Sequence, residues 1–453
     1  MTRNPGTVAR TAGLFVLCML ASLRPVHAAL PASTGNQPVL RIEGSNTIDD
    51  TLAPALVKGL MQREGIQSPQ EEASADGLVK RLVGKNAQGQ PVIVEIAAKG
   101  SASGFAALQA NTAQVVASTR PIATTEAALL KELGDMHADG AEQVIALDAL
   151  AVVVHPSNPL QRISPRQLAA VFAGEIKTWE ELGSHGGPIA LYAMGSDSGS
   201  RQEFVDSVLA PQGKALATTA NQAATSAKLA EAVGLTPQAI GFVGLAYADK
   251  LKTLAIGDEG ATAIAPGTDS VRSEDYPLTR RLYFYARPHT SDPWALALLE
   301  FAQSTEGQAL VARNGFVAQT VEAVTVAPAD GMPDAYKALA SGAHRLSINL
   351  RFKEDSAKLD SKSEQDMPRV IDYLKRQNKL AKQVVLVGFG DAKTDPARAA
   401  LLSKLRAMAV SRQLGKAGVS VRDVLSLGDA LPVAGNDSDA GRLKNRRVEI
   451  WVY

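Results

Sequence analysis

The chain has 453 residues and a formal net charge of +1, with 45% hydrophobic and 21% charged residues. This length exceeds what one ordinary hydrophobic core requires, so two or three domains are expected. The near-neutral charge provides no basic excess that would indicate binding to nucleic acid or to anionic membranes.

The first residues have the pattern of a secretory signal peptide. Arg3 and Arg10 precede an apolar run at 12–23, and the small-residue sequence Val26-His27-Ala28 follows. The run is shorter than the about 20 residues that span a bilayer, so we predict export and removal of residues 1–28. Cys18, the single cysteine, lies inside this run. The mature chain would therefore have no thiol for a disulfide, a metal site or a nucleophile.

Removal of this segment changes the net charge slightly. It contains three arginines and no acidic residue, which leaves 44 basic and 46 acidic residues and a net charge of −2. The mature chain therefore still has no basic excess.

Between residues 39 and 325, short strand-like runs alternate with stretches of helical spacing. Strands are expected at VLRIEG, VIVEIAA, QVVAST, ALAVVVHP, PIALYAM and AIGFVGLAYA, and helices at 52–60, 165–172, 202–209 and 294–312. This alternation predicts an α/β fold with mostly parallel sheets.

Residues 326–345 are rich in Pro, Ala and Gly, and we predict a linker with room for one short helix. The remaining segment, 346–453, has a different pattern. It contains a strand at LSINLRF, a helix at 363–377, a strand at VVLVGFG, a helix at 399–417 and a strand at RRVEIWVY. This order predicts a compact α+β domain of ordinary size.

Three loops of similar composition each join a predicted strand to a predicted helix. They read EGSNTIDD, KGSASGFAAL and GSDSGSRQEF. Helix N-termini present unpaired N–H groups and the positive end of the helix dipole, so several that converge can hold a small oxyanion. Alternatively, each hydroxyl caps its own helix, as the capping-box pair Ser200 and Glu203 suggests. The presence of three such loops favours an anion site.

Residues 39–325 resemble the periplasmic phosphate-binding proteins (PstS-like) of ABC importers. The resemblance rests on EGSNTI, GSASGF, ASTRPI, ALDALAVVVHPSNP, ISPRQLAAVFAGEIKTWEEL, DSGSR, IGFVGLAYA and DYPLTRRLYFY. It implies a type II-like binding protein of two α/β lobes that close over the ligand about a hinge. The phosphate-binding positions that it implies are Thr47, Ile48, Ser101, Ser103, Ser198, Gly199 and Ser200.

The sequence departs from this family at two matching positions. Met194 stands where members usually have an arginine that pairs with the anion, and Thr119 stands where the best-known members have an aspartate that accepts a proton from phosphate. Arg120 and Arg201 are the candidates for replacement charge. Asp148 either contacts the site or closes the turn before its strand.

The final segment, 346–453, resembles the OmpA-like domain that associates with peptidoglycan. The resemblance rests on VGFGD, LSKLRAMAV and GRLKNRRVEIWV. It implies that Asp391 and Arg406 hold the diaminopimelate side chain of the peptide stem, because a zwitterionic end needs one carboxylate and one guanidinium group. Ala399 and the pair Phe389-Gly390 depart from the family pattern.

Together these features predict a secreted, wall-tethered binding protein for phosphate or a related oxyanion. It would feed an ABC importer permease or act as a sensor, in the periplasm or outer-membrane-associated envelope of a Gram-negative bacterium. The scattered histidines and the lack of a G-x-S-x-G elbow predict no metal, no cofactor and no enzyme. One alternative is a structural envelope protein whose lobes have lost their ligand and mediate protein contacts. A hydrolase that uses a cleft hydroxyl is a weaker third hypothesis.

Overall fold

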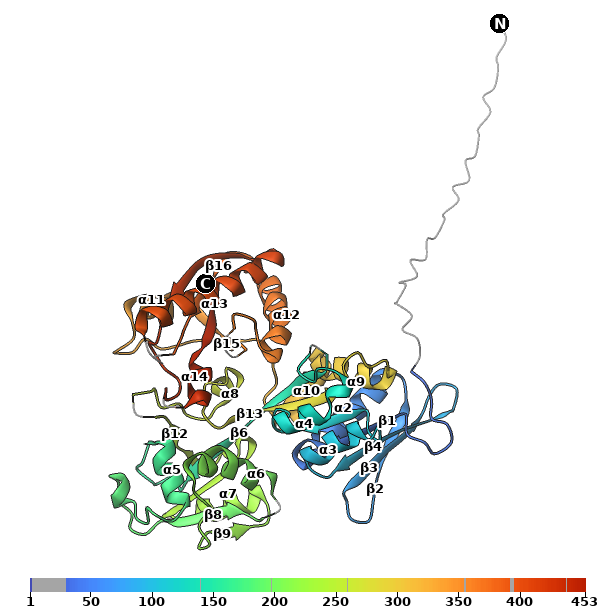
Figure 1. Cartoon of the computed structure of the whole chain (residues 1–453), viewed down its shortest axis with the longest axis horizontal. Coiled ribbons are helices and arrows are strands. Elements are labelled where there is room, and N and C mark those ends of the chain that lie inside the picture. The colour runs from blue at the N-terminus through green and yellow to red at the C-terminus, as the bar shows by residue number, and fades with distance from the viewer. Residues whose placement is uncertain are drawn as a thin grey trace.

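The computed structural model describes Met1 and residues 30–453, apart from 139, 197, 259, 354–355, 392–394 and 437. Apart from Met1, the predicted signal peptide, 1–28, lies outside the described residues. The described chain forms three bodies, two α/β lobes and a C-terminal domain beside them (Figure 1). None of the helices in this part of the chain has the length and apolarity needed to cross a bilayer.

Lobe 1 is built around three parallel strands with an antiparallel hairpin at one edge. The sheet order is β2-β3-β4-β1-β5. Its strands are β1 (Leu40–Gly44), β2 (Gln67–Ala73), β3 (Val79–Lys85), β4 (Pro91–Ala98) and β5 (Val115–Ser118). Its helices are α1 (Asn46–Asp49), α2 (Leu52–Arg63), α3 (Ser101–Gln109), α4 (Thr124–Leu129), α9 (Pro293–Gln303) and α10 (Thr305–Arg313).

Lobe 2 has a smaller sheet in which β10, β8 and β9 run parallel. Its strands are β7 (Arg162–Ile163), β8 (Ala190–Met194), β9 (Asn221–Ala223), β10 (Ala239–Gly244), β11 (Lys252–Thr253) and β12 (Ala255–Ile256). Its helices are α5 (Pro165–Phe172), α6 (Gly199–Phe204), α7 (Ser226–Leu235) and α8 (Thr268–Arg272).

Two long strands, β6 (Glu142–Val154) and β13 (Thr279–Ala286), connect the lobes. The first part of β6 pairs with β13, and its last part pairs with β10 of lobe 2. Both pairings are antiparallel, as is the pairing of β13 with β5. The expectation of mostly parallel sheets was therefore wrong. The pairings of the two connecting strands are antiparallel, and so are those of β2 with β3 and of β3 with β4 inside lobe 1.

The C-terminal domain contains a five-stranded sheet of order β14-β15-β18-β16-β17. Its strands are β14 (Ala323–Val324), β15 (His344–Arg351), β16 (Ala381–Gly388), β17 (Ser420–Ser426) and β18 (Arg447–Val452). Its helices are α11 (Asp334–Gly342), α12 (Ser361–Arg376), α13 (Pro396–Lys416) and α14 (Asp439–Asn445).

The segment predicted to be a linker, 326–345, is mostly part of this folded domain. Helix α11 lies inside it, and the ring of Tyr336 packs edge-on against Trp451 at 5.2 Å between centroids. Tyr336 and Leu339 are both buried. The two apolar side chains lie three residues apart and therefore on one helix face, and their burial anchors a segment whose composition resembles that of a linker.

Each of the three bodies has its own hydrophobic core. A fully buried tryptophan marks each one: Trp294 in lobe 1, Trp179 in lobe 2 and Trp451 in the C-terminal domain. The cores of the two lobes are joined, because one apolar cluster runs from Phe105 and Val116 of lobe 1 along β6 to Trp179 of lobe 2. The contacts of the C-terminal domain with the lobes are of a different, largely polar kind.

The C-terminal domain contacts lobe 2 and the hinge through charged groups. Arg281 of β13 binds Glu274 at 2.6 Å and Asp360 of the C-terminal domain at 2.7 Å. Arg345 of β15 binds Asp275 at 2.7 Å. Burial alone would raise the pKa of Glu274, but the charges of Arg281 and neighbouring cations outweigh it and hold that pKa well below its usual range.

The same domain also contacts lobe 1 through helix α12. Ser361 donates a hydrogen bond to Glu142, and Gln365 donates to the carbonyl of Glu142 at 3.3 Å. Arg369 donates to the side chain of Gln319 at 3.3 Å. The C-terminal domain therefore bridges both lobes at the hinge, as the position of α12 beside the lobe 1 helices in Figure 1 also shows.

Candidate functional site

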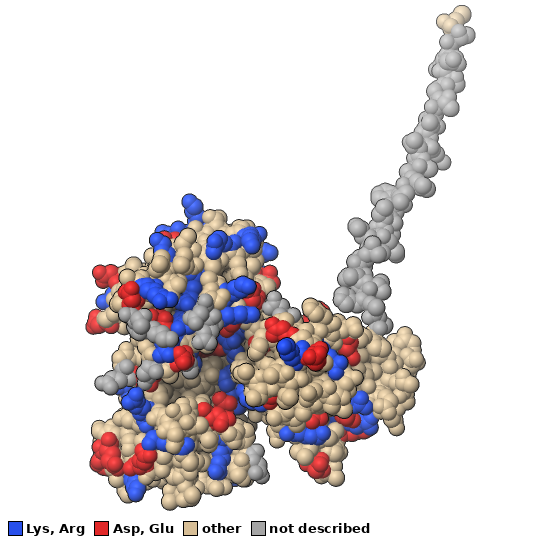
Figure 2. Space-filling view, viewed as in Figure 1, with Lys and Arg blue, Asp and Glu red and all other residues tan. Residues whose placement is uncertain are grey.

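A cavity of about 860 Å³ lies where the three bodies meet. Figure 2 shows the surface hollowed at this junction, with Lys and Arg atoms along its edge. Lobe 1 lines the cavity with the three loops that follow β1, β4 and β5, and lobe 2 lines it with α6 and the turn after it. The C-terminal domain contributes Arg351, Phe352, Asp360, Leu443 and Lys444.

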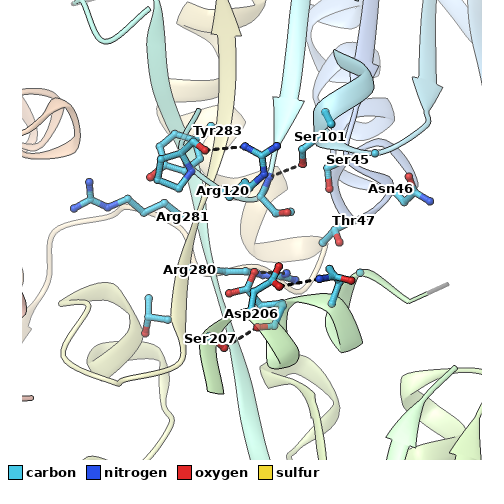
Figure 3. Close-up of a pocket in the computed structure, with 18 of the residues that line it drawn as sticks. Ser45, Asn46, Thr47, Ser101, Arg120, Asp206, Ser207, Arg280, Arg281 and Tyr283 are labelled. Atoms are coloured by element: carbon cyan, nitrogen blue, oxygen red, sulfur yellow. Dashed lines mark hydrogen bonds and ion pairs between the residues drawn. The ribbon is translucent and has the colours of Figure 1, made fainter. Parts of the chain in front are cut away.

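Two of the predicted lobe 1 hydroxyl groups line the cavity. Thr47 and Ser101 stand at the starts of helices and point toward the same space (Figure 3). Ile48 and Ser103 do not line it. The Ile48 side chain is fully buried in the lobe 1 core, and the Ser103 hydroxyl donates to the Gly100 carbonyl at 2.8 Å. Successive residues at a helix start point about 100° apart, so only some of them can face one ligand.

Helix α6 of lobe 2 supplies the opposite wall. Ser198 caps the helix by accepting from the Arg201 N–H at 3.5 Å, and both Ser198 and Gly199 line the cavity. A Cβ atom built on Gly199 would lie 3.0 Å from the Thr47 hydroxyl oxygen. The two lobes therefore meet at this point, and a side chain at residue 199 would fit only if Thr47 moved. Ser200 does not line the cavity.

Arg120 and Arg201 were predicted to supply the positive charge that is absent at Met194, but each of them binds another group of the protein. Arg120 lines the cavity, but its guanidinium group binds the carboxylate of Glu126 at 2.7 and 2.8 Å. The hydrogen bonds to Glu126 raise the pKa of Arg120. Arg201 does not line the cavity and donates instead to the Met194 carbonyl at 3.3 Å. Met194 itself is 7% exposed and packs in the lobe 2 core.

The sequence analysis missed a third arginine, Arg280 of β13. It lines the cavity, is 7% exposed, and binds Asp148 of β6 at 2.6 and 2.9 Å. Its other terminal nitrogen lies 3.5 Å from Glu203, whose pKa is raised by burial. Asp148 therefore pairs with a cation at the hinge. The signal in the sequence was Asp148, a charged residue at a buried position in the mostly apolar strand β6. Its partner Arg280 lies 132 residues later in the chain, so the pairing could not be predicted.

The predicted peptidoglycan-binding residues each contact another side chain of the C-terminal domain. Asp391, after β16, binds Arg446 at 2.9 Å. The preceding residue, Gly390, packs against α13, where its Cβ position would be 3.0 Å from the Ala399 carbonyl oxygen. Arg406, also on α13, is buried, and its guanidinium carbon lies 5.6 Å from the ring centre of Phe352. Phe352 also lines the cavity, so this region adjoins the lobe loops.

A buried carboxyl group lies directly behind the first loop. Asp49 is 0% exposed, and neither of its oxygens has a hydrogen-bond partner among the described residues. Burial, followed by the nearby charges of Asp50 and Glu43, raises its pKa well above the usual value. The native state therefore holds this carboxyl protonated at pH values where an unfolded chain releases the proton.

The replacement Asp49→Asn is expected to stabilise the protein at high pH. With a raised folded pKa, the native state binds more protons, so natural stability falls as pH rises from about 4. Asparagine cannot ionise and removes this loss, which should make the variant more stable at pH 8 by at least about 1 kcal/mol. Denaturant unfolding at pH 5 and pH 8 measures the difference, with exposed Asp249→Asn of lobe 2 as the control. Parallel pH profiles for the natural protein and Asp49→Asn would contradict the interpretation.

Comparison with known proteins identifies the families of the two-lobed segment and of the C-terminal domain. A PBP superfamily domain matches residues 65–306, more than half of the chain. The chain belongs to the PBP superfamily. An OmpA family domain matches residues 351–446. The expected two-part organisation, with a two-lobed binding protein followed by an OmpA-like domain, is confirmed.

The relatives of this chain include proteins named as phosphate-binding. The phosphate-binding protein PstS of Pseudomonas aeruginosa is 27% identical over 243 residues, which cover 50% of this chain and 74% of that protein. Protein SphX of Synechococcus elongatus is 30% identical over 228 residues, which cover 48% and 64% of the two chains. The crystal structure of PstS from Borrelia burgdorferi aligns with 62% of this chain and 99% of its own, with 23% identity and a TM-score of 0.47.

The superfamily match and the similarity to phosphate-binding proteins agree with the expectation of a solute-binding protein rather than an enzyme. The two domains indicate a periplasmic or envelope location. In the part of the chain that the structure describes, no group of three His, Cys, Asp or Glu residues is arranged to hold a metal ion.

Proposed function

We propose that this PBP superfamily protein binds phosphate or a related oxyanion in the cavity and is attached to peptidoglycan through its C-terminal domain. The observation that carries the proposal is the convergence of Thr47 and Ser101 from lobe 1 with Ser198 and Gly199 from lobe 2. The names of the PstS relatives support phosphate as the ligand. The family resemblance further supports delivery of the ligand to an ABC importer permease.

The chemistry of these groups suits an oxyanion. Hydroxyl groups donate hydrogen bonds to anionic oxygens, and helix starts add backbone N–H groups and partial positive charge. Arg280 provides a full positive charge in the same cavity, but Asp148 already neutralises part of it. Hydrogen bonds to charged groups are about twice as strong as neutral ones. The affinity for phosphate should therefore depend on whether the Arg280 guanidinium group can bind the ligand as well as Asp148.

One observation favours a second candidate, a structural envelope protein without a ligand. Arg120 and Arg280, two of the cations that line the cavity, both bind carboxylates in this structure. A cavity whose cations are already neutralised attracts anions less strongly. Titration with phosphate separates the two candidates, since the structural protein would give no binding at millimolar concentration.

The replacement Gly199→Val is expected to weaken phosphate binding at least about tenfold, or 1.4 kcal/mol. The added side chain would occupy the space next to the Thr47 hydroxyl, 3.0 Å from the Cβ position, and hold the lobes apart. Calorimetric titration of the purified protein with phosphate measures the effect. Gly195→Val is the matched control, because nothing lies within 4 Å of its Cβ position. Equal affinities for both variants would contradict the proposed site.

The replacements Asp391→Ala and Arg406→Ala are each expected to remove most of the binding to peptidoglycan. A hydrogen bond to a charged group contributes roughly 1.5–3 kcal/mol, so the loss should be about tenfold or more. Co-sedimentation of the full protein with diaminopimelate-type peptidoglycan measures the bound fraction. Asp372→Ala, an exposed acid on α12, is the control. If both variants sediment as the natural protein does, attachment at these residues is wrong.

A further inference from the structure

The cavity is larger than an inorganic oxyanion requires. Its volume of about 860 Å³ lies within the range of 300–1,000 Å³ that is typical of pockets for organic ligands. Inorganic phosphate has only five non-hydrogen atoms. The loops with Thr47, Ser101 and Ser198 occupy one part of the lining, and the rest belongs to α6, the hinge and the C-terminal domain. The cavity therefore extends beyond the oxyanion loops to the hinge and the C-terminal domain.

Carboxylates surround this remaining space. Glu203 and Asp206 from lobe 2, Glu274 beside the hinge and Asp360 from the C-terminal domain all line it. Asp206 is exposed, and Figure 3 shows it beside Arg280 and across the cavity from Thr47. Carboxylates accept hydrogen bonds from hydroxyl groups but repel a second anionic group. Lysines and arginines line the same cavity, and three of the four acids lie against them: Glu274 and Asp360 bind Arg281, and Glu203 lies 3.5 Å from Arg280. Asp206 is therefore the acid best placed to accept a hydrogen bond from a ligand hydroxyl and to disfavour a second anionic group beside it.

Two other groups in the lining are suited to an organic ligand. The Thr279 hydroxyl oxygen is buried and has no hydrogen-bond partner among the described residues. Leu443 of α14 is 41% exposed and also lines the cavity. An unpaired buried hydroxyl is costly unless a partner arrives, and an exposed leucine gains from contact with carbon atoms. Free phosphate has no C–H surface to offer Leu443.

We infer that the cavity binds a phosphomonoester of a sugar or polyol, with its phosphate on the oxyanion loops and its hydroxylated body toward the C-terminal domain. This inference rests on the proposed function, because it uses the same oxyanion loops. It assigns Asp206 and Thr279 to hydroxyl groups of the ligand. It also gives the C-terminal domain a direct part in ligand binding.

Calorimetric titration of the full protein tests the inference with four probes: inorganic phosphate, glycerol 3-phosphate, glucose 6-phosphate and fructose 1,6-bisphosphate. We expect at least one monoester to bind about tenfold more tightly than inorganic phosphate, and the bisphosphate to bind more weakly than glucose 6-phosphate. Free glucose serves as the control for binding without a phosphate group and should give no heat.

Two variants locate the body of the ligand. Thr279→Val keeps the shape of the side chain but removes the hydroxyl, and Asp206→Asn removes one carboxylate. Each should weaken the favoured monoester about fivefold and leave inorganic phosphate equally or more tightly bound. Monoesters that bind no better than inorganic phosphate would overturn the inference while leaving oxyanion binding intact. An absence of heat with every probe would instead contradict the proposed function itself.

Discussion

Replacement of Arg281 by alanine is expected to lower the free energy of unfolding by about 3–5 kcal/mol, because it strands buried charges. Arg281 binds Glu274 at 2.6 Å and Asp360 at 2.7 Å, and all three side chains are at most one-fifth exposed. Its loss would leave two carboxylates without their main cation at the junction of hinge and C-terminal domain. The domain should then detach more readily from the lobes.

Denaturant unfolding measures the loss in stability, and small-angle scattering measures the detachment as a larger maximum dimension. Lys228→Ala is the control, because its pair with Glu231 is exposed on both sides and should contribute at most about 1 kcal/mol. If Arg281→Ala resembles this control in both measurements, the ion pairs do not hold the three bodies together.

The replacement Arg280→Ala is expected to cost a similar amount, about 3–5 kcal/mol, and also to weaken phosphate binding. Arg280 is almost completely buried, and its two hydrogen bonds to Asp148 join the crossing strands β13 and β6. The variant would leave Asp148 as an unpaired buried carboxylate beside the ligand. Both the stability of the hinge and the affinity for phosphate should therefore decrease.

The double variant Arg280→Met with Asp148→Leu separates the two effects. Apolar replacement of both members of a buried pair is often neutral for stability, so unfolding should recover most of the loss. Phosphate binding should not recover, because the cation is still absent. If the double variant binds phosphate as the natural protein does, Arg280 serves only the fold.

Local patterns in the sequence were sufficient for many elements. Helix α5 begins and ends at the predicted residues, Pro165 and Phe172. Ser164 caps it by accepting from the Gln167 N–H at 3.1 Å, and the Gln167 side chain accepts from the Ser164 N–H at 3.0 Å. These signals lie within four residues of each other, so they are readable without the fold. Thr47, Ser101, Ser198 and Gly199 came instead from the family resemblance, and local composition indicated only the loops that contain them.

Other features depended on residues distant in the chain. The composition of 326–345 indicated a linker, yet Tyr336 finds Trp451 more than 100 residues later and the segment folds onto the sheet. The helical turn directs Ser103, Ser200 and Arg201 away from the cavity. A composition or a motif defines a residue's neighbours in sequence but does not determine which side of a helix meets a ligand.

The sequence by itself determined the two families, the strand and helix pattern within each, and the loops able to hold an oxyanion. The tertiary structure decided the rest. It paired Arg280 with Asp148, joined Arg281 to the C-terminal domain and gave both lobes and that domain one shared cavity. The physical reason is that capping and periodicity act over a few residues, whereas buried charge pairs form only where folding brings distant segments together.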